Sequence, residues 1–161
     1  MTAFPTSQLY IDGKLRAAEG GRVYKNIAPA TGKEIGEAAD ASAADMEAAI
    51  AAARKAFDHS DWPTNLKLRL DCLRRFQVEL RKRGEDFSAR VAAETGSAGM
   101  VMMGPGFHLP VEFMSWTIDA AEKYEYEHEL PVSTAMGVPS RRIVVREAAG
   151  VVAAITPWNV P

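Results

Sequence analysis

Residues 1–40 alternate short apolar runs with residues that are typical of turns. The run Leu9–Ile11 leads into Asp12-Gly13, and later runs are bounded by further glycines. Short β-branched and aromatic runs around such pairs are typical of hairpins. Residues 27–33 are predicted to form a turn, and residues 34–38 a short strand. The chain should therefore begin with a β-hairpin.

From residue 42 the apolar positions follow a helical spacing. Ser42 and Asp45 form a capping box, which predicts a helix start. The apolar stripe that follows consists of Met46, Ala49, Ile50, Ala53 and Phe57. Pro63 disfavours helical geometry at the residue before it, so this helix should end within residues 59–63.

Two more helices are predicted before residue 97. Thr64 can cap the first of them. Its apolar stripe consists of Leu66, Leu70, Leu73, Phe76 and Leu80. Basic residues 81–83 precede Gly84, an order that favours a left-handed cap at that glycine. The next helix should cover residues 85–95 and end at Gly96.

Residues 96–110 are rich in Gly, Pro and Met and are predicted to form a loop. A fourth helix should follow, because apolar residues again recur at helical spacing. Those that share one face of it are Phe113, Trp116, Thr117, Ala120, Ala121 and Tyr124.

The last part of the chain has the pattern of β-strands. Residues 141–147 alternate, as expected for a strand with one solvated face. Residues 151–155 are apolar at every position, which is typical of a strand covered on both faces of a parallel sheet. Each parallel neighbour with its crossover takes about 30 residues, and six follow Ile155. We expect the rest of this sheet to lie outside the chain; the alternative is antiparallel pairing with residues 142–147.

Composition narrows the class of protein. The chain has 161 residues, 47% hydrophobic and 25% charged, with a net charge of -2, which is typical of a globular domain. A near-neutral chain gives no reason to expect a nucleic acid or an anionic membrane as partner. Cys72 is the one cysteine, and the first residues lack the apolar segment of a secretory signal. We therefore expect a cytoplasmic protein.

Candidate chemistry is concentrated after residue 155. Ligands of open α/β sheets bind at the carboxyl ends of strands, and Thr156, Pro157, Trp158 and Asn159 directly follow the predicted strand. Trp158 offers a rigid aromatic wall, and the amide of Asn159 carries two donor hydrogens. Asn is also common in tight turns, so Asn159 could be only a turn residue.

The run Gly-Val-Val-Ala-Ala-Ile-Thr-Pro-Trp-Asn-Val-Pro at residues 150–161 closely resembles the aldehyde dehydrogenase superfamily. Earlier landmarks match in the same order. They are Ala-Pro-Ala-Thr-Gly-Lys-Glu at 28–34, where Ala28 replaces the family's usual Asn, then Asp61-Trp62, Glu94-Thr95-Gly96 and Arg-Arg-Ile-Val-Val-Arg-Glu at 141–147. The resemblance thus covers nearly the whole chain.

The resemblance implies an α/β fold, namely the N-terminal part of a Rossmann-like cofactor domain. Its parts would be an N-terminal hairpin with helices over residues 1–130, a β arm that pairs subunits of a homo-oligomer over 131–149, and the first strand of the parallel sheet with its turn over 150–161.

The resemblance also implies oxidation of a small-molecule aldehyde to a carboxylic acid with NAD or NADP. In the family a cysteine thiolate attacks the carbonyl, hydride passes to the nicotinamide, and a glutamate-activated water releases the acid. Asn159 matches the asparagine whose amide stabilises the oxyanion. Ile155, Thr156, Pro157 and Trp158 match residues that line the cofactor cleft.

Other residues that could carry chemistry have simpler interpretations. The family's nucleophilic cysteine and general-base glutamate have no match here, so the chain alone should be inactive. Cys72 lies inside a helix and is interpreted as structural. The three histidines have no metal-ligand spacing, and we predict no metal site, although Asn26, Ile27 and Glu94 match the region of a monovalent-cation site in some members. The alternative to a dehydrogenase is a complete, non-catalytic oligomerisation or interaction module.

Overall fold

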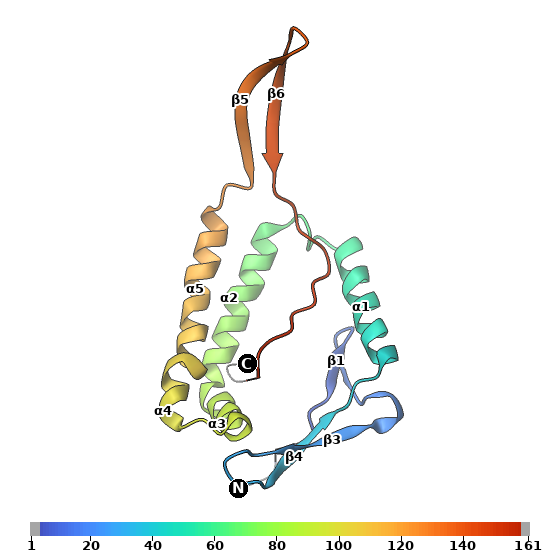
Figure 1. The fold of residues 1–161 in the computed structure, drawn as a ribbon, viewed down its shortest axis with the longest axis vertical. Coiled ribbons are helices and arrows are strands. Elements are labelled where there is room, and N and C mark those ends of the chain that lie inside the picture. The colour runs from blue at the N-terminus through green and yellow to red at the C-terminus, as the bar shows by residue number, and fades with distance from the viewer. Residues whose placement is uncertain (1–3, 159–161) are drawn as a thin grey trace.

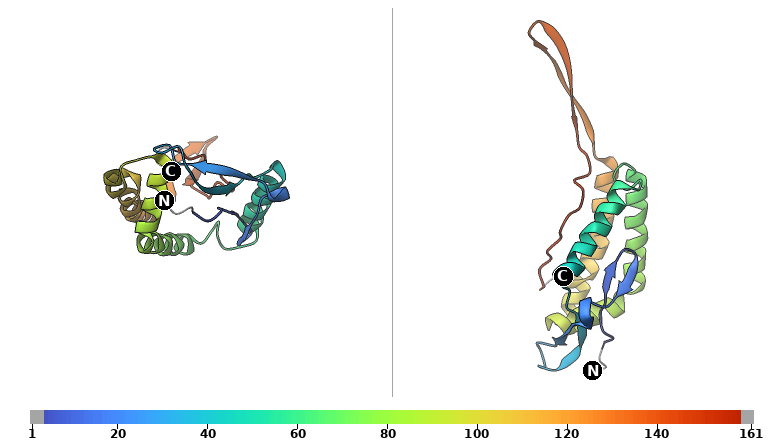
Figure 2. Two further views of the ribbon diagram at one scale, coloured as in Figure 1. Left: turned by 90° about the horizontal axis from the view of Figure 1, so that it is seen from below. Right: turned by 90° about the vertical axis from the view of Figure 1, so that its right-hand side faces the viewer.

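The structure is a computed structural model that describes residues 4–158. N-terminal hairpins and one helix lie to one side of a group of helices, and a long two-stranded arm extends from one end (Figures 1 and 2). The elements are β1 (Leu9–Ile11), β2 (Lys14–Arg16), a 3-10 turn (Glu19–Gly21), β3 (Val23–Ile27), β4 (Glu34–Ala39), α1 (Ala43–Asp58), α2 (Leu66–Lys82), α3 (Gly84–Thr95), α4 (Gly99–Val101), a π-helical segment (Met102–Gly106), α5 (His108–Lys123), β5 (Glu127–Ala135) and β6 (Val138–Val145).

The N-terminal strands form two antiparallel hairpins. β1 pairs with β2, and β3 pairs with β4. The β1–β2 turn has positive φ at both Asp12 (52°) and Gly13 (76°), which matches the right-handed twist of the strands that it joins. The prediction of an N-terminal hairpin and of a strand near residues 34–38 is therefore confirmed.

The helix ends follow local capping chemistry. The capping box of Ser42 and Asp45 is present at the start of α1. Gly96 ends α3 with φ 71°, as predicted. The predicted N-cap Thr64 is wrong by one residue, because the side chain of Asn65 accepts the backbone N–H of Leu68 at 2.9 Å.

Two predictions between α2 and α5 are also wrong. Gly84 is not a left-handed cap; it is buried and begins α3, close to the ring of His108. Residues 96–110 are not all loop, since they contain α4, the π-helical segment and the start of α5. Met102 is 3% exposed and anchors this stretch, which supplies the burial that short helical turns need.

The helical core lies between α2 and α5. Leu70 of α2 is buried, as are Val111 and Ile118 of α5. Between them the buried amide of Gln77 donates to the carbonyl oxygen of Val111 at 2.6 Å and to the Ser115 hydroxyl at 2.8 Å. A buried amide fixes the helix register, because a slip would leave its hydrogens without acceptors.

Two ion pairs flank the α2–α5 contact. Arg81 forms a bidentate pair with Glu112, at 2.8 and 2.7 Å, and Arg74 reaches Glu122 at 2.7 Å. The hydrogen bond from Arg81 lowers the pKa of the Glu112 carboxyl below its ordinary value.

The sequence placed Phe113 and Trp116 on the predicted apolar face of α5, but these side chains are 62% and 75% exposed.

The arm consists of β5 and β6, which pair antiparallel from Glu127↔Val145 to Ala135↔Val138. An irregularity in register lies between Leu130 and Ser133. The guanidinium of Arg141 donates twice to Glu129 across the strands, at 2.8 and 3.1 Å. The two strands extend well beyond the helices (Figure 1).

The predicted strand over residues 151–155 does not form in this structure. Residues 146–157 are irregular, and Val152 and Ile155 are 73% and 96% exposed. The alternative pairing with residues 142–147 is also wrong, because that segment pairs with β5. Apolar residues alone do not make a strand: its backbone groups need partners, and within residues 4–158 no element supplies them.

Much apolar surface is open to solvent. The accessible surface is 11935 Å², whereas a compact monomer of 17.5 kDa would expose about 7,900 Å². Met46 and Ile50 of α1 are 58% and 44% exposed, as is Phe76 of α2 at 56%. In the part of the chain that the structure describes, no helix is long and apolar enough to cross a bilayer.

Candidate functional site

The predicted cofactor residues lie on an extended segment that runs back from the arm along one side of the helices (Figures 1 and 2). Ile155, Thr156, Pro157 and Trp158 are all exposed, with Ile155 at 96% and Trp158 at 77%. Asn159, the predicted oxyanion donor, lies outside the described residues.

The beginning of this segment is close to α1. Gly150 has φ 111°, and a Cβ placed on it would lie 3.4 Å from Nη1 of Arg54. The guanidinium of Arg54 is also paired with Asp58 and stands 4.5 Å from the ring centre of Phe57. Arg54 is thus the side chain through which α1 meets the backbone at Gly150.

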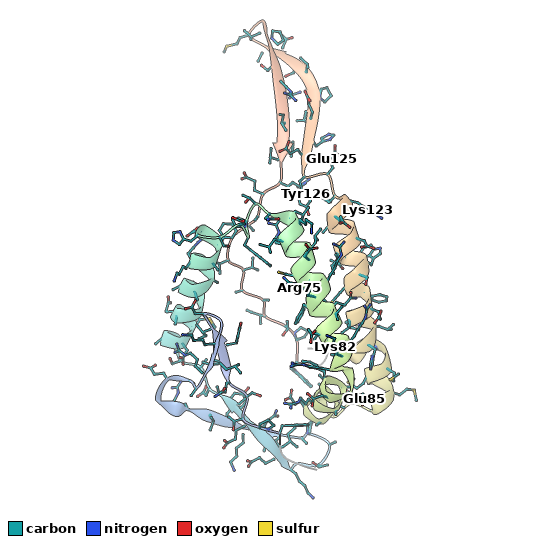
Figure 3. All side chains as sticks on the ribbon, turned by 180° about the vertical axis from the view of Figure 1, so that it is seen from behind. Arg75, Lys82, Glu85, Lys123, Glu125 and Tyr126 are labelled. Carbon is teal, nitrogen blue, oxygen red and sulfur yellow. The ribbon has the colours of Figure 1, made fainter. Side chains whose placement is uncertain are left out.

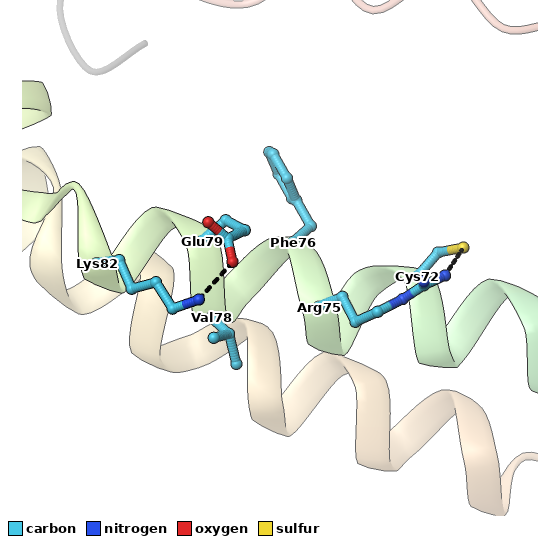
Figure 4. Close-up of a pocket in the computed structure, with 6 residues that line it drawn as sticks. All are labelled: Cys72, Arg75, Phe76, Val78, Glu79 and Lys82. Atoms are coloured by element: carbon cyan, nitrogen blue, oxygen red, sulfur yellow. Dashed lines mark hydrogen bonds and ion pairs between the residues drawn. The ribbon is translucent and has the colours of Figure 1, made fainter.

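An open pocket of about 530 Å³ lies along α2, lined by Cys72, Arg75, Phe76, Val78, Glu79 and Lys82 (Figure 4). Its polar side chains pair with one another. Nη2 of Arg75 lies 3.2 Å from Sγ of Cys72, and Lys82 reaches Glu79 at 2.7 Å. Cys72 is half-buried in the middle of α2, away from the helix N-terminus that would activate a thiol.

A second pocket, of about 730 Å³, lies at the base of the arm. The α1–α2 connection contributes Pro63 and Thr64 to its lining, and the arm contributes Tyr126 and Glu127. The label of Tyr126 marks this base in Figure 3, just beyond Lys123 at the end of α5. The hydroxyl of Tyr126 donates to the carbonyl oxygen of Ala121 at 3.1 Å and so ties the arm to α5.

The structure brings together two residues that match the cation-site region. Nδ2 of Asn26 on β3 donates to Oε1 of Glu94 on α3 at 2.8 Å. Among residues 4–158 no group of three or more His, Cys, Asp or Glu side chains is arranged to hold a metal ion. The contact joins the N-terminal hairpins to the helices.

One buried carboxylate gathers more contacts than its sequence pattern predicted. Asp45 is 1% exposed and accepts hydrogen bonds from Nη2 of Arg16 at 2.6 Å and from the backbone N–H of Glu19 at 2.9 Å. It also accepts the backbone N–H of Ser42 at 3.0 Å and its hydroxyl at 3.2 Å. The capping box predicted only the bonds with Ser42, since nothing in the sequence connects residues 16–19 to this helix.

These bonds make Asp45 acid-sensitive. The N–H groups of Glu19 and Ser42, with Arg16, lower the pKa of Asp45 from 3.8 to about 2. The folded state therefore binds the proton less tightly than the unfolded chain. The stabilisation is complete above a pH of about 4 and is lost as the pH falls towards 2.

Urea unfolding followed by circular dichroism should show D45N less stable than wild type at neutral pH, with the difference disappearing near pH 2. A difference in stability that persists unchanged at that pH would contradict the lowered pKa of Asp45.

The side chains at positions 155–158 are of chemical types that can contact a dinucleotide. Ile155 and Trp158 offer apolar surface to a nicotinamide ring, and the hydroxyl of Thr156 can hydrogen-bond a ribose. None of the four is charged, so they supply no cation for a pyrophosphate. Their exposure leaves these groups available to a ligand or to another part of a protein.

The comparisons with known proteins agree with one another. The chain matches the aldehyde dehydrogenase family over residues 15–161. It is 32% identical to 3-sulfolactaldehyde dehydrogenase of Pseudomonas putida, covering 96% of this chain and 30% of the relative. It is 34% identical to N-succinylglutamate 5-semialdehyde dehydrogenase 2 of Caulobacter vibrioides, covering 95% and 30%.

A solved structure is similar in fold. The crystal structure of Mycobacterium tuberculosis aldehyde dehydrogenase complexed with NAD+ has a TM-score of 0.78 and 30% identity, covering 91% of this chain and 29% of that one. The α/β fold class predicted from the sequence is thereby confirmed. The chain belongs to the aldehyde dehydrogenase family, and it spans about a third of the length of these relatives.

Proposed function

We propose that the chain is the N-terminal portion of an NAD(P)-dependent aldehyde dehydrogenase, which oxidises an aldehyde to a carboxylic acid. The observation that carries the proposal is the family match, which runs to residue 161 and includes the Pro-Trp-Asn motif. Two features support it. The two relatives named above are each matched over about 30% of their length, and the segment before this motif is apolar and exposed.

In this proposal Ile155, Thr156, Pro157 and Trp158 form one wall of the cofactor cleft. Bound NAD(P)+ supplies the hydride acceptor. Asn159 donates its side-chain amide to the oxygen of the substrate carbonyl as negative charge develops there, because a pre-organised donor stabilises the transition state more than the ground state. The nucleophilic cysteine and the general-base glutamate come from outside this chain, so the chain alone is inactive.

The test is a fusion of residues 1–161 to the remaining part of the Pseudomonas putida 3-sulfolactaldehyde dehydrogenase. We expect this fusion to form NADH or NADPH with that relative's aldehyde, and the unfused chain to form neither. The matched control is the same C-terminal part without residues 1–161, which should be inactive. A folded fusion that binds the cofactor and never reduces it would refute the proposal.

We also propose that β5 and β6 pair subunits of a homo-oligomer in the cytoplasm. Val138 of β6 is 62% exposed on an arm that extends away from the helices. V138D would place a charge where a partner subunit covers the strand, and burying an unpaired charge costs several kcal/mol. Subunits of the active fusion that carry V138D should therefore associate at least about tenfold more weakly. Light scattering, which reports the mass of the oligomer, measures this. The control is L15D, a change at the 68% exposed Leu15 of the N-terminal hairpin, which should leave the mass unchanged. Equal masses for all three proteins would contradict the arm's role.

A further inference from the structure

α1 has few supports in the structure. It packs against β1, whereas the helical core lies between α2 and α5. Its apolar side chains Met46 and Ile50 remain exposed. Figure 1 shows α1 beside the N-terminal hairpins and apart from α2. Its position must therefore depend mainly on what holds its N-terminal end.

That end is held by one side chain. The carboxylate of Asp45 takes hydrogen bonds from β2 through Arg16, from the 3-10 turn through the N–H of Glu19, and from the N-cap Ser42. An ordinary capping box uses the acidic side chain only for the N-cap N–H. Here the same carboxylate joins three segments, and its 1% exposure protects the bonds from water.

We propose that Asp45, with Arg16, Glu19 and Ser42, is a latch that makes the β1–β2 hairpin and α1 one rigid unit. Releasing the latch lets α1 and the hairpin move independently, while α2 and α5 stay packed. The α2–α5 contact does not share these residues, since it rests on Leu70, Gln77 and Ile118.

The latch also has a consequence for the segment at 150–158. α1 carries Arg54, which lies beside Gly150. The position of α1 therefore determines whether the Arg54 guanidinium lies next to the beginning of that segment. This consequence rests on the proposed cofactor role of residues 155–158. The latch itself does not, because it concerns only contacts within residues 16–45 and can be tested in the chain without any cofactor.

The experiment is amide hydrogen exchange of the chain, comparing wild type with D45N. Asn is isosteric with Asp but carries no charge and has one acceptor oxygen in place of two. We expect exchange in residues 9–21 and 43–58 to be at least about tenfold faster in D45N, and to rise by a clearly larger factor than exchange in residues 66–82 and 108–123, as for local opening. Unchanged protection of α1, no protection of α1 in wild type, or an equal loss in every helix would each overturn the latch.

Two further variants separate a latch from a helix cap. S42A removes the capping hydroxyl but leaves the bonds to Arg16 and Glu19, so faster exchange should be confined to the first turn of α1. R16Q removes the guanidinium from the other side and should speed exchange in both the hairpin and α1, even if D45N does not fold. D86N is the matched control, because Asp86 is an exposed helical carboxylate paired with Arg90 at 3.1 Å. Faster exchange of the hairpin in S42A, or of α1 in D86N, would contradict the proposal.

Discussion

Replacing Asn159 by Ala in the active fusion should lower kcat by a factor of about 10²–10³, which corresponds to a loss of about 3–4 kcal/mol of transition-state stabilisation. The physical reason is that an oxyanion in a site without water has no substitute for a missing pre-organised donor. KM should change little, since the amide interacts with charge that exists only during the reaction. Steady-state kinetics with the aldehyde varied at saturating cofactor measures both constants.

The control for N159A is Q8A, which removes an exposed amide near β1 and should leave kcat unchanged. N159D is a second comparison, because a carboxylate at that position places an acceptor charge against the oxyanion and should be at least as damaging as Ala. Equal kcat in wild type and N159A, with the cofactor bound in both, would show that Asn159 is only a turn residue.

Features that depend on neighbours in sequence could be predicted well. The capping box of Ser42 and Asp45 and the left-handed Gly96 are both present, because a cap involves groups only a few residues apart. The same holds for the Asp12-Gly13 turn. For Thr64 the prediction failed by one position, since both Thr64 and Asn65 carry side-chain oxygens that can cap and sequence alone did not decide between them.

Features that depend on distant partners could not be predicted. Residues 151–155 have the composition of a buried strand, but a strand forms only beside another strand. The contacts of Asp45 with Arg16 and Glu19 join positions 29 and 26 residues apart, and no local pattern marks them. The candidate site is therefore predicted only from the family's terminal motif, whereas the proximity of Arg54 on α1 to Gly150 comes only from the structure.

Which face of α5 packs against α2 could not be predicted either, because both sides of this helix are apolar. One side holds Val111 and Ile118, which are buried against α2, and the opposite side holds Phe113 and Trp116, which are exposed. Helical spacing cannot choose between two apolar faces. The choice follows from α2, whose Gln77 amide reaches the Val111 carbonyl and Ser115.

Truncating Ile118 to Ala should therefore destabilise the chain by about 3 kcal/mol. Its side chain is 2% exposed, and removing buried methyl and methylene groups loses their transfer free energy and leaves a cavity. Few large side chains are buried among the described residues. We therefore expect a loss of this size to abolish most of the cooperative unfolding transition in urea, which circular dichroism at about 222 nm measures.

The matched control is F113A, a larger truncation on the opposite side of α5. Phe113 is 62% exposed, so its loss should change the free energy of unfolding by no more than about 0.5 kcal/mol. The two variants together decide which face of α5 packs. If F113A were the more damaging, the face that carries Phe113 and Trp116 would be the buried one, and the packing of Val111 and Ile118 against α2 would be wrong.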